Sequence, residues 1–172
     1  LQIPDMSALA AERYQTHKED YALVPERRTS SHILFACPPG ACSREDTKVK
    51  AQKVLDELRT GADFGEMVRA HSGDPGTKTK EGKFDRWIAK GETGVAGPYA
   101  EGLFTIEGVG DYSELVNTQF GVHIIRLDGV QEQHFLPYEE VKEKIVAELR
   151  TEYRRISIKD YTSKFHMTEN VV

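Results

Sequence analysis

Three features are scarce in this sequence: long apolar runs, positive charge and cysteine. No run of about 18 apolar residues occurs, so nothing in it predicts a membrane span. The 172 residues include 28 acidic and 23 basic side chains, and the net charge of −5 argues against a general nucleic-acid-binding protein. Because the chain begins at Leu1 rather than Met, its missing signal peptide says nothing about where the protein resides.

The two cysteines, Cys37 and Cys42, lie in one short segment that reads Cys-Pro-Pro-Gly-Ala-Cys. A structural zinc site takes four ligands, so two thiolates alone make a poor one. Two interpretations stay open: a disulfide that closes a small loop in an oxidising compartment, or two unpaired thiols. Residues 37–47 carry a single base, Arg44, so we expect no selectivity for phosphorylated ligands.

Two short apolar, β-branched stretches, about ninety residues apart, each contain one histidine. One is Ser31–Phe35 with His32, and the other is Phe120–Leu127 with His123. Both patterns predict strands. The second is apolar on both faces, which is typical of a central strand. A histidine in such a strand is buried or half-buried and needs hydrogen-bond partners. We expect the two strands to pair and to bring the imidazoles together.

The remaining pattern supplies helices and further strands. Apolar spacing predicts a first helix from about Met6 that ends between His17 and Tyr21. Further helices are predicted near residues 43–61, 63–71, 98–104 and from Pro137 onward, with Ser43 as a cap. Strands are predicted near residues 31–36, 84–88, 115–118 and 122–127. The order is helix, β-α-α-β-α-β-β, helix. This order favours an α+β fold in which helices pack on an antiparallel sheet.

Five stretches, in this order, resemble the parvulin-type (PpiC/rotamase) peptidyl-prolyl cis-trans isomerase domain. They are Ser31-His32-Ile33-Leu34, Gly61-Ala62-Asp63-Phe64, Ser72-Gly73-Asp74-Pro75, Pro98-Tyr99-Ala100-Glu101-Gly102-Leu103-Phe104 and Thr118-Gln119-Phe120-Gly121-Val122-His123-Ile124-Ile125. The resemblance implies a four-stranded antiparallel sheet with packed helices over residues 28–128. Residues 1–27 and 129–172 would then be N- and C-terminal helical extensions.

The flanks resemble those of cell-envelope foldases of the SurA, PpiD and PrsA type. Tyr21 to Pro25 precedes the domain, and a charged Pro-Tyr-Glu-Glu-Val-Lys helix follows it. This likeness implies an isomerase that assists the folding of envelope or secreted proteins, in the periplasm or cell envelope. Its partners would be unfolded or proline-containing polypeptides, and not nucleic acid. It implies no cofactor and no metal, and a chaperone module outside the given sequence.

The resemblance also assigns the site. Its catalytic network would be His32, Asp74, Thr118 and His123, beneath an apolar cup for the proline ring. The residues that contact substrate would be Phe84, Trp87, Val95, Tyr99, Phe104 and Phe120, with Thr93 as an alternative to Val95. Structural roles compete with several of these assignments: Tyr99 and Phe104 suit core packing, Asp74 suits a turn, and Thr118 suits a strand.

Three departures from the family pattern support a second hypothesis. The usual glycine-rich run is replaced by Glu81-Gly82-Lys83-Phe84-Asp85, the usual cup methionine is missing, and Tyr99 stands where phenylalanine is usual. The alternative is a catalytically weak parvulin-fold chaperone that binds peptides in the same cleft. A third interpretation, an unrelated α+β domain, requires the five stretches to be coincidental.

Overall fold

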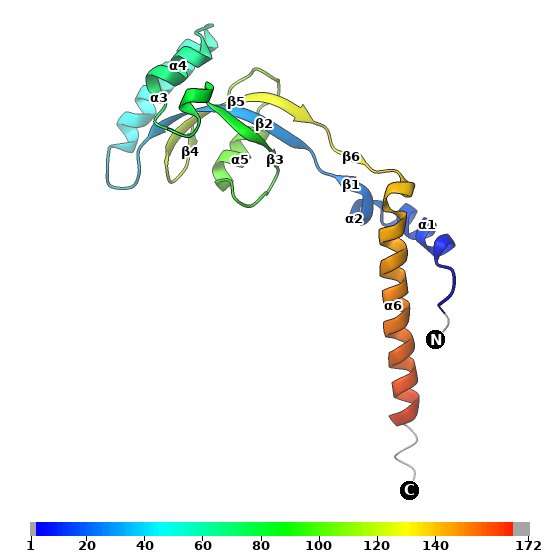
Figure 1. Ribbon diagram of the computed structural model, residues 1–172. Helices are drawn as coiled ribbons and strands as arrows, with labels where there is room; N and C mark the ends of the chain where they lie inside the picture. The colour runs from blue at the N-terminus through cyan, green and yellow to red at the C-terminus, as the bar shows by residue number, and fades with distance from the viewer. Residues whose placement is uncertain (1–2, 167–172) are drawn as a thin grey trace. The chain divides into compact units, whose positions relative to one another are not determined.

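The computed structural model describes residues 3–166 and divides the chain into two compact units (Figure 1). One unit is Pro25–Glu132, and the other combines the segments on either side of it. The described part of the chain contains no helix that is both long and apolar enough to cross a membrane.

The unit Pro25–Glu132 is built on a four-stranded antiparallel sheet with the strand order β3-β2-β5-β4. Figure 1 shows two long strands, β2 and β5, running together through its centre. The bounds are β2 Arg27–Ala36, β3 Lys83–Ala89, β4 Val116–Asn117 and β5 Gly121–Gln131. The α+β sheet expected from the sequence is therefore confirmed, and the two histidine strands are its central pair. Both extend several residues beyond the predicted ranges, with a bulge between Thr29 and Ser30.

Side chains of β5 alternate between the two faces of the sheet, as the pleat requires. Val122 and Ile124 pack with Ile33 and Phe35 of β2 against α3 (Arg44–Arg59) and α4 (Phe64–His71). Ile125 and Leu127 join the core on the opposite face, with α5 (Gly97–Phe104). His123 shares the parity of Ile125 and Leu127, so it faces the α5 side.

The helices begin where the sequence provides caps. The Ser43 hydroxyl accepts a hydrogen bond from the Asp46 amide at the start of α3, and the Asp63 carboxylate accepts one from the Glu66 amide at the start of α4. Pro98 lies in the first turn of α5, where its missing N–H costs nothing. A short 3₁₀ helix, η1 (Lys78–Lys80), interrupts the segment that the sequence predicts as a loop.

The second unit is helical and has its own core. It contains α1 (Ser7–Thr16), α2 (Lys18–Ala22), α6 (Tyr138–His166) and a small pair of strands, β1 (Leu23–Val24) with β6 (His134–Phe135). Eight buried side chains form its core: Met6, Ala10, Tyr14, Ala22, Val141, Ile145, Val146 and Leu149. The first helix, predicted to end between His17 and Tyr21, ends at Thr16, because the His17 backbone leaves helical geometry; the short α2 follows it. Two-residue strands give too little pattern to be predicted.

Candidate active site

A cavity of about 270 Å³ opens on the α5 side of the central strands. Small-molecule pockets in proteins are typically about 300–1,000 Å³, so this cavity suits one side chain rather than a large ligand. Its walls are mainly apolar, and its polar side chains are two histidines, one carboxylate and one phenol. The lining residues are His32, Leu34, Asp74, Phe84, Gly94, Val95, Ala96, Tyr99, Phe120 and His123.

The pairing register brings the two histidines together. His123 lies opposite Leu34, and His32 lies opposite Ile125, so the histidines are diagonal neighbours on one face. Their ring centroids are 5.4 Å apart with an interplanar angle of 78°. Tyr99 completes a group of three rings, because its centroid is 5.5 Å from that of each histidine. The expectation that strand pairing joins the imidazoles is confirmed.

His32 is held at both ring nitrogens. Its Nε2 lies 2.9 Å from Asp74 Oδ2, and its Nδ1 lies 3.2 Å from the Tyr99 hydroxyl. An ionised carboxylate only accepts hydrogen bonds, so we place the ring proton on Nε2. Nδ1 then accepts from Tyr99, whose oxygen accepts in turn from the Ser30 hydroxyl at 3.0 Å. This chain of bonds fixes both the tautomer and the orientation of His32.

Asp74 is fixed by neighbours other than His32. The Thr77 hydroxyl donates to its Oδ2 at 2.6 Å, and the Gly76 amide donates to its Oδ1 at 3.0 Å. Burial opposes the charged carboxylate, but these bonds and His32 outweigh it and lower the pKa of Asp74. The sequence suggests a turn residue as the alternative to a site residue, and the geometry shows that Asp74 serves the turn while also binding His32.

His123 is buried to the same degree as His32 but has fewer hydrogen-bond partners. Its Nε2 is 2.8 Å from the Thr118 hydroxyl, which also accepts the Phe120 amide at 3.2 Å. Its buried Nδ1 has no hydrogen-bond partner within residues 3–166. Burial is the main cause that lowers the pKa of His123 to about 3. Repulsion from the protonated form of His32 and from Arg44 adds to it, and Asp74 opposes it. Burial also lowers the pKa of His32, although Asp74 opposes this shift. Both imidazoles are therefore neutral at pH 7.

Seven of the ten predicted site residues line the cavity, namely His32, Asp74, Phe84, Val95, Tyr99, Phe120 and His123. Thr118 lies behind the wall and contacts the site through His123. Of the two candidates for the missing methionine, Val95 is in the wall and Thr93 is not among its described lining residues.

Trp87 and Phe104 are the two predicted substrate-binding residues that the structure places outside the cavity lining. Trp87 alternates with Phe84 along β3, so the two rings point to opposite faces, and Trp87 lies over Gly129. Phe104 is five residues from Tyr99, which is about 140° around a helix. Its ring packs in the core beneath the Arg28 guanidinium, which is 4.9 Å from the ring centroid.

Five residues of the site are absent from the sequence-based prediction. Ser30 and Thr77 supply hydroxyls to the polar network, and Leu34, Gly94 and Ala96 supply wall. Strand alternation gives a signal for two of them, since Ser30 and Leu34 flank His32 at a spacing of two. Nothing in the local sequence singles out Thr77, because its contact depends on the fold of the loop after α4.

Comparison with known proteins agrees with this geometry. Residues 32–129, more than half of the chain, match the rotamase family described as the PPIC-type PPIase domain. The chain belongs to this family. Foldase protein PrsA 4 of Bacillus cereus is 34% identical over 119 residues, which is 69% of this chain and 37% of that protein. Chaperone SurA of Hydrogenovibrio crunogenus is 32% identical over 100 residues, which is 57% of this chain and 21% of that protein.

The PPIC-type fold is also found in solved structures. One belongs to the work on PEB4 and the periplasmic protein Cj1289, two SurA-like chaperones of Campylobacter jejuni. It matches with a TM-score of 0.70 at 23% identity, over 100% of this chain and 64% of that one. This likeness shows the fold alone. The chain spans well under half the length of the curated relatives described above.

Proposed function

We propose that this chain is a peptidyl-prolyl cis-trans isomerase that catalyses rotation about X–Pro peptide bonds in polypeptide clients. The observation that carries the proposal is a cavity with apolar walls above two neutral, neighbouring imidazoles, inside a PPIC-type domain. Its foldase and chaperone relatives support a role in assisting protein folding.

The isomerisation breaks no covalent bond. Rotation about a peptide bond costs about 18–20 kcal/mol, while the two X–Pro isomers differ by only about 0.5–1 kcal/mol. Twisting the amide removes its resonance, so its carbonyl oxygen loses negative charge. Water stabilises the planar, more polar ground state. A dry apolar cavity removes part of that preference and favours the twisted state.

The site residues would divide this work. Phe84, Val95, Tyr99 and Phe120 would enclose the proline ring, and His32 with His123 would form a rigid floor beneath it. Asp74 and Thr118 would act by holding one imidazole each, at 2.9 Å and 2.8 Å. We assign Asp74 no nucleophilic role, because the rotation proceeds without a covalent intermediate.

A protease-coupled assay on an Ala-X-Pro peptide tests the proposal. We expect the protein at micromolar concentration to accelerate isomerisation, and we expect Tyr99→Ala and His123→Ala to lose activity, the second partly through stability. Trp87→Ala is the matched aromatic control outside the cavity, and should retain the wild-type rate. Peptide binding without acceleration would instead identify a chaperone module that uses the cleft without catalysis.

The two compact units support a proposal about the larger protein. We propose that residues 28–128 are the isomerase domain, while residues 1–27 and 129–172 belong to a helical module whose other parts lie outside this sequence. The relatives named foldase and chaperone favour a cell-envelope location and unfolded polypeptide clients. A disulfide between Cys37 and Cys42 is consistent with an oxidising compartment.

A further inference from the structure

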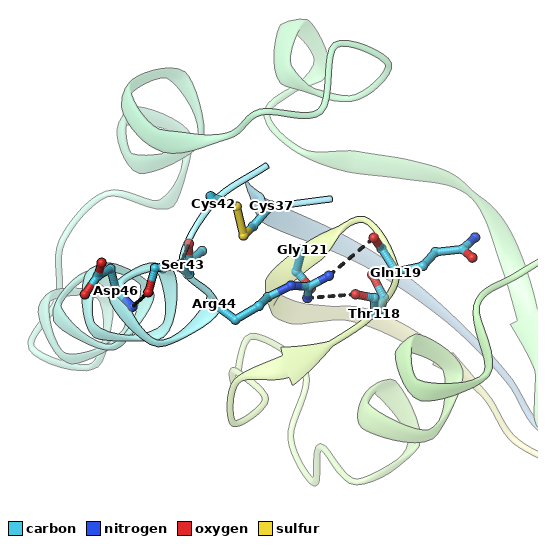
Figure 2. Close-up of a disulfide and its surroundings, with 9 residues drawn as sticks. Cys37, Cys42, Ser43, Arg44, Asp46, Thr118, Gln119 and Gly121 are labelled. Atoms are coloured by element: carbon cyan, nitrogen blue, oxygen red, sulfur yellow. Dashed lines mark hydrogen bonds between the residues drawn. A yellow bond between two sulfur atoms is a disulfide. The ribbon is translucent and has the colours of Figure 1, made fainter. Parts of the chain in front are cut away.

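Arg44 and Cys37 donate hydrogen bonds to all four backbone carbonyl groups of the turn 118–121, which joins β4 to β5. Arg44 Nη1 donates to the carbonyls of Thr118 at 2.8 Å and Gly121 at 3.1 Å, and its Nη2 donates to that of Gln119 at 3.3 Å. The Cys37 amide donates to the carbonyl of Phe120 at 2.9 Å. Figure 2 shows the guanidinium reaching from the start of α3 into this turn.

The turn carries two parts of the proposed active site. Thr118 places its hydroxyl 2.8 Å from His123 Nε2, and Phe120 forms part of the cavity wall. The conformation of the turn therefore determines where the His123 imidazole and the Phe120 ring lie. A turn of this length has few bonds of its own. Here the Thr118 amide donates to the Gly121 carbonyl at 2.9 Å, and the Phe120 amide donates to the Thr118 hydroxyl at 3.2 Å.

A disulfide restrains the backbone from which the Arg44 side chain extends. Cys37 and Cys42 are bonded, with Cα atoms 5.7 Å apart, so the buried Cys37, directly after β2, is tied to the segment that enters α3 (Figure 2). Arg44 is the first residue of α3 and follows Cys42 by two positions. An arginine side chain has many rotamers, and anchoring its backbone reduces the ordering that its three hydrogen bonds require.

We propose that Arg44, anchored by the Cys37–Cys42 disulfide, is a positioning residue of the isomerase site. It fixes the turn 118–121 and thereby Thr118, His123 and Phe120. The inference rests on the proposed function, and it adds that full activity requires the oxidised form of the chain. Resonance assignments of the His123 ring report the positioning without any rate measurement.

Three variants and one control test this. Arg44→Met removes the donors but keeps the length, Arg44→Lys keeps the charge and one donor group, and Cys42→Ser opens the disulfide at its exposed end. Arg59→Met, at the far end of α3, is the matched control, because its partner is the exposed carboxylate of Glu114. The readouts are the His123 ring nitrogen shifts, hydrogen exchange of the Thr118 amide, and kcat/KM.

In Arg44→Met we expect shifted His123 ring signals, faster exchange at Thr118 and about a tenfold loss of kcat/KM, less than the roughly 100-fold that a 1 Å misplacement can cost. Arg44→Lys should be intermediate and Arg59→Met should match the wild type. In Cys42→Ser the His123 signals, the Thr118 exchange rate and kcat/KM should change in the same direction as in Arg44→Met. The same changes are expected in the wild type after reduction by dithiothreitol. Dithiothreitol transfers two electrons and two protons to the cystine and itself becomes a cyclic disulfide.

Unchanged His123 signals in a folded Arg44→Met protein overturn the inference, as does a loss of stability with the ring signals and the rate per folded molecule preserved. If Arg44→Met does not fold, Cys42→Ser and the reduced wild type decide the same question by the same signals. A wild type without isomerase activity contradicts the proposed function instead, and the His123 and Thr118 signals still test the positioning by Arg44.

Discussion

Tyr99 shows how one hydroxyl group reorganises the site. The family usually has phenylalanine there, and the extra oxygen in this chain lies between Ser30 and His32. It occupies the Nδ1 atom of His32, while the Nδ1 atom of His123 is left without a partner in the described structure. Burial, despite the Ser30 bond, raises the pKa of the Tyr99 phenol, so the group remains a hydrogen-bond donor.

Tyr99→Phe separates the ring of this residue from its hydroxyl. We expect the free energy of unfolding to fall by about 1–3 kcal/mol, because Ser30 and His32 each lose a buried partner. The His32 Nδ1 resonance should move, while the cavity wall and peptide affinity stay near wild type. Urea unfolding and ring nitrogen spectra measure both effects. Ser30→Ala is the control, and an unchanged His32 signal in Tyr99→Phe would show that the hydroxyl does not set the tautomer.

The neutral histidines also predict acid sensitivity. The folded pKa of His123 is about 3, below its unfolded value near 6.5, so acidification charges the unfolded chain first. Its stabilising contribution is complete above pH 6.5 and is lost as the pH falls toward 3. Well below pH 6.5 the free energy of unfolding should drop by about 1.4 kcal/mol per pH unit through His123, and by less than that between pH 7 and 6. Urea titrations at pH 7, 6 and 5 measure the slope, which should be smaller in His123→Leu. Equal slopes in the two proteins would contradict the assignment.

At the scale of elements, the register of β2 against β5 builds the site. The close approach of these strands at their ends depends on Gly121, whose added Cβ would lie 2.1 Å from the Phe35 carbonyl oxygen. This glycine also has a φ of 154°, which side chains rarely adopt. The turn that holds Thr118 therefore ends at a position that accepts only glycine.

Gly121→Ala should destabilise the protein by several kcal/mol, in the range of the largest single-residue effects, because the clash is with backbone that cannot move aside. Gly97→Ala is the matched control, since nothing lies within 4 Å of its added Cβ and it is the first residue of α5. That control should be neutral or slightly stabilising. Thermal unfolding of both variants measures the difference, and similar melting temperatures would refute the close-packing argument.

The same elements explain what the sequence could predict. Alternation along β5 and its apolar character on both faces predicted a central strand, and the two histidine strands pair as expected. The Ser43 cap and the strand at Phe84 were also recoverable from local pattern. Trp87 and Phe104 were assigned by resemblance, although strand and helix periodicity places them away from Phe84 and Tyr99. Thr77 and the role of Arg44 depend on tertiary contacts that no local pattern encodes.

At the scale of the whole molecule, the chain has two compact units, and the helical unit has a core of its own. Ile145 is fully buried in the helical unit, among Met6, Tyr14 and Val141, and contributes nothing to the cavity. The cavity lies in the unit Pro25–Glu132. A mutation that destabilises the helical unit should therefore leave the isomerase activity of this unit unchanged.

Ile145→Ala should cost about 2–5 kcal/mol in the helical unit and leave the isomerisation rate unchanged, because its contacts lie outside the site. Hydrogen exchange of α1 and α6 amides reports the first effect, and the peptide assay reports the second. Ile125→Ala, in the core beside His123, is the counterpart that should lower both stability and rate. A parallel loss of rate in Ile145→Ala would mean that the two units do not act independently.

The most direct test of the account observes the bond and the cavity together. Exchange spectroscopy on an Ala-Ala-Pro-Phe peptide, with labelled protein present, measures the cis–trans rate and the signals of Phe84, Val95 and Phe120 in one sample. The account predicts faster exchange of the two peptide isomers and shifts at these three residues, with no such shifts from Ala-Ala-Ala-Phe. A cis–trans rate equal to that of the free peptide at saturating protein, or peptide-induced shifts only at residues outside the cavity, would contradict it.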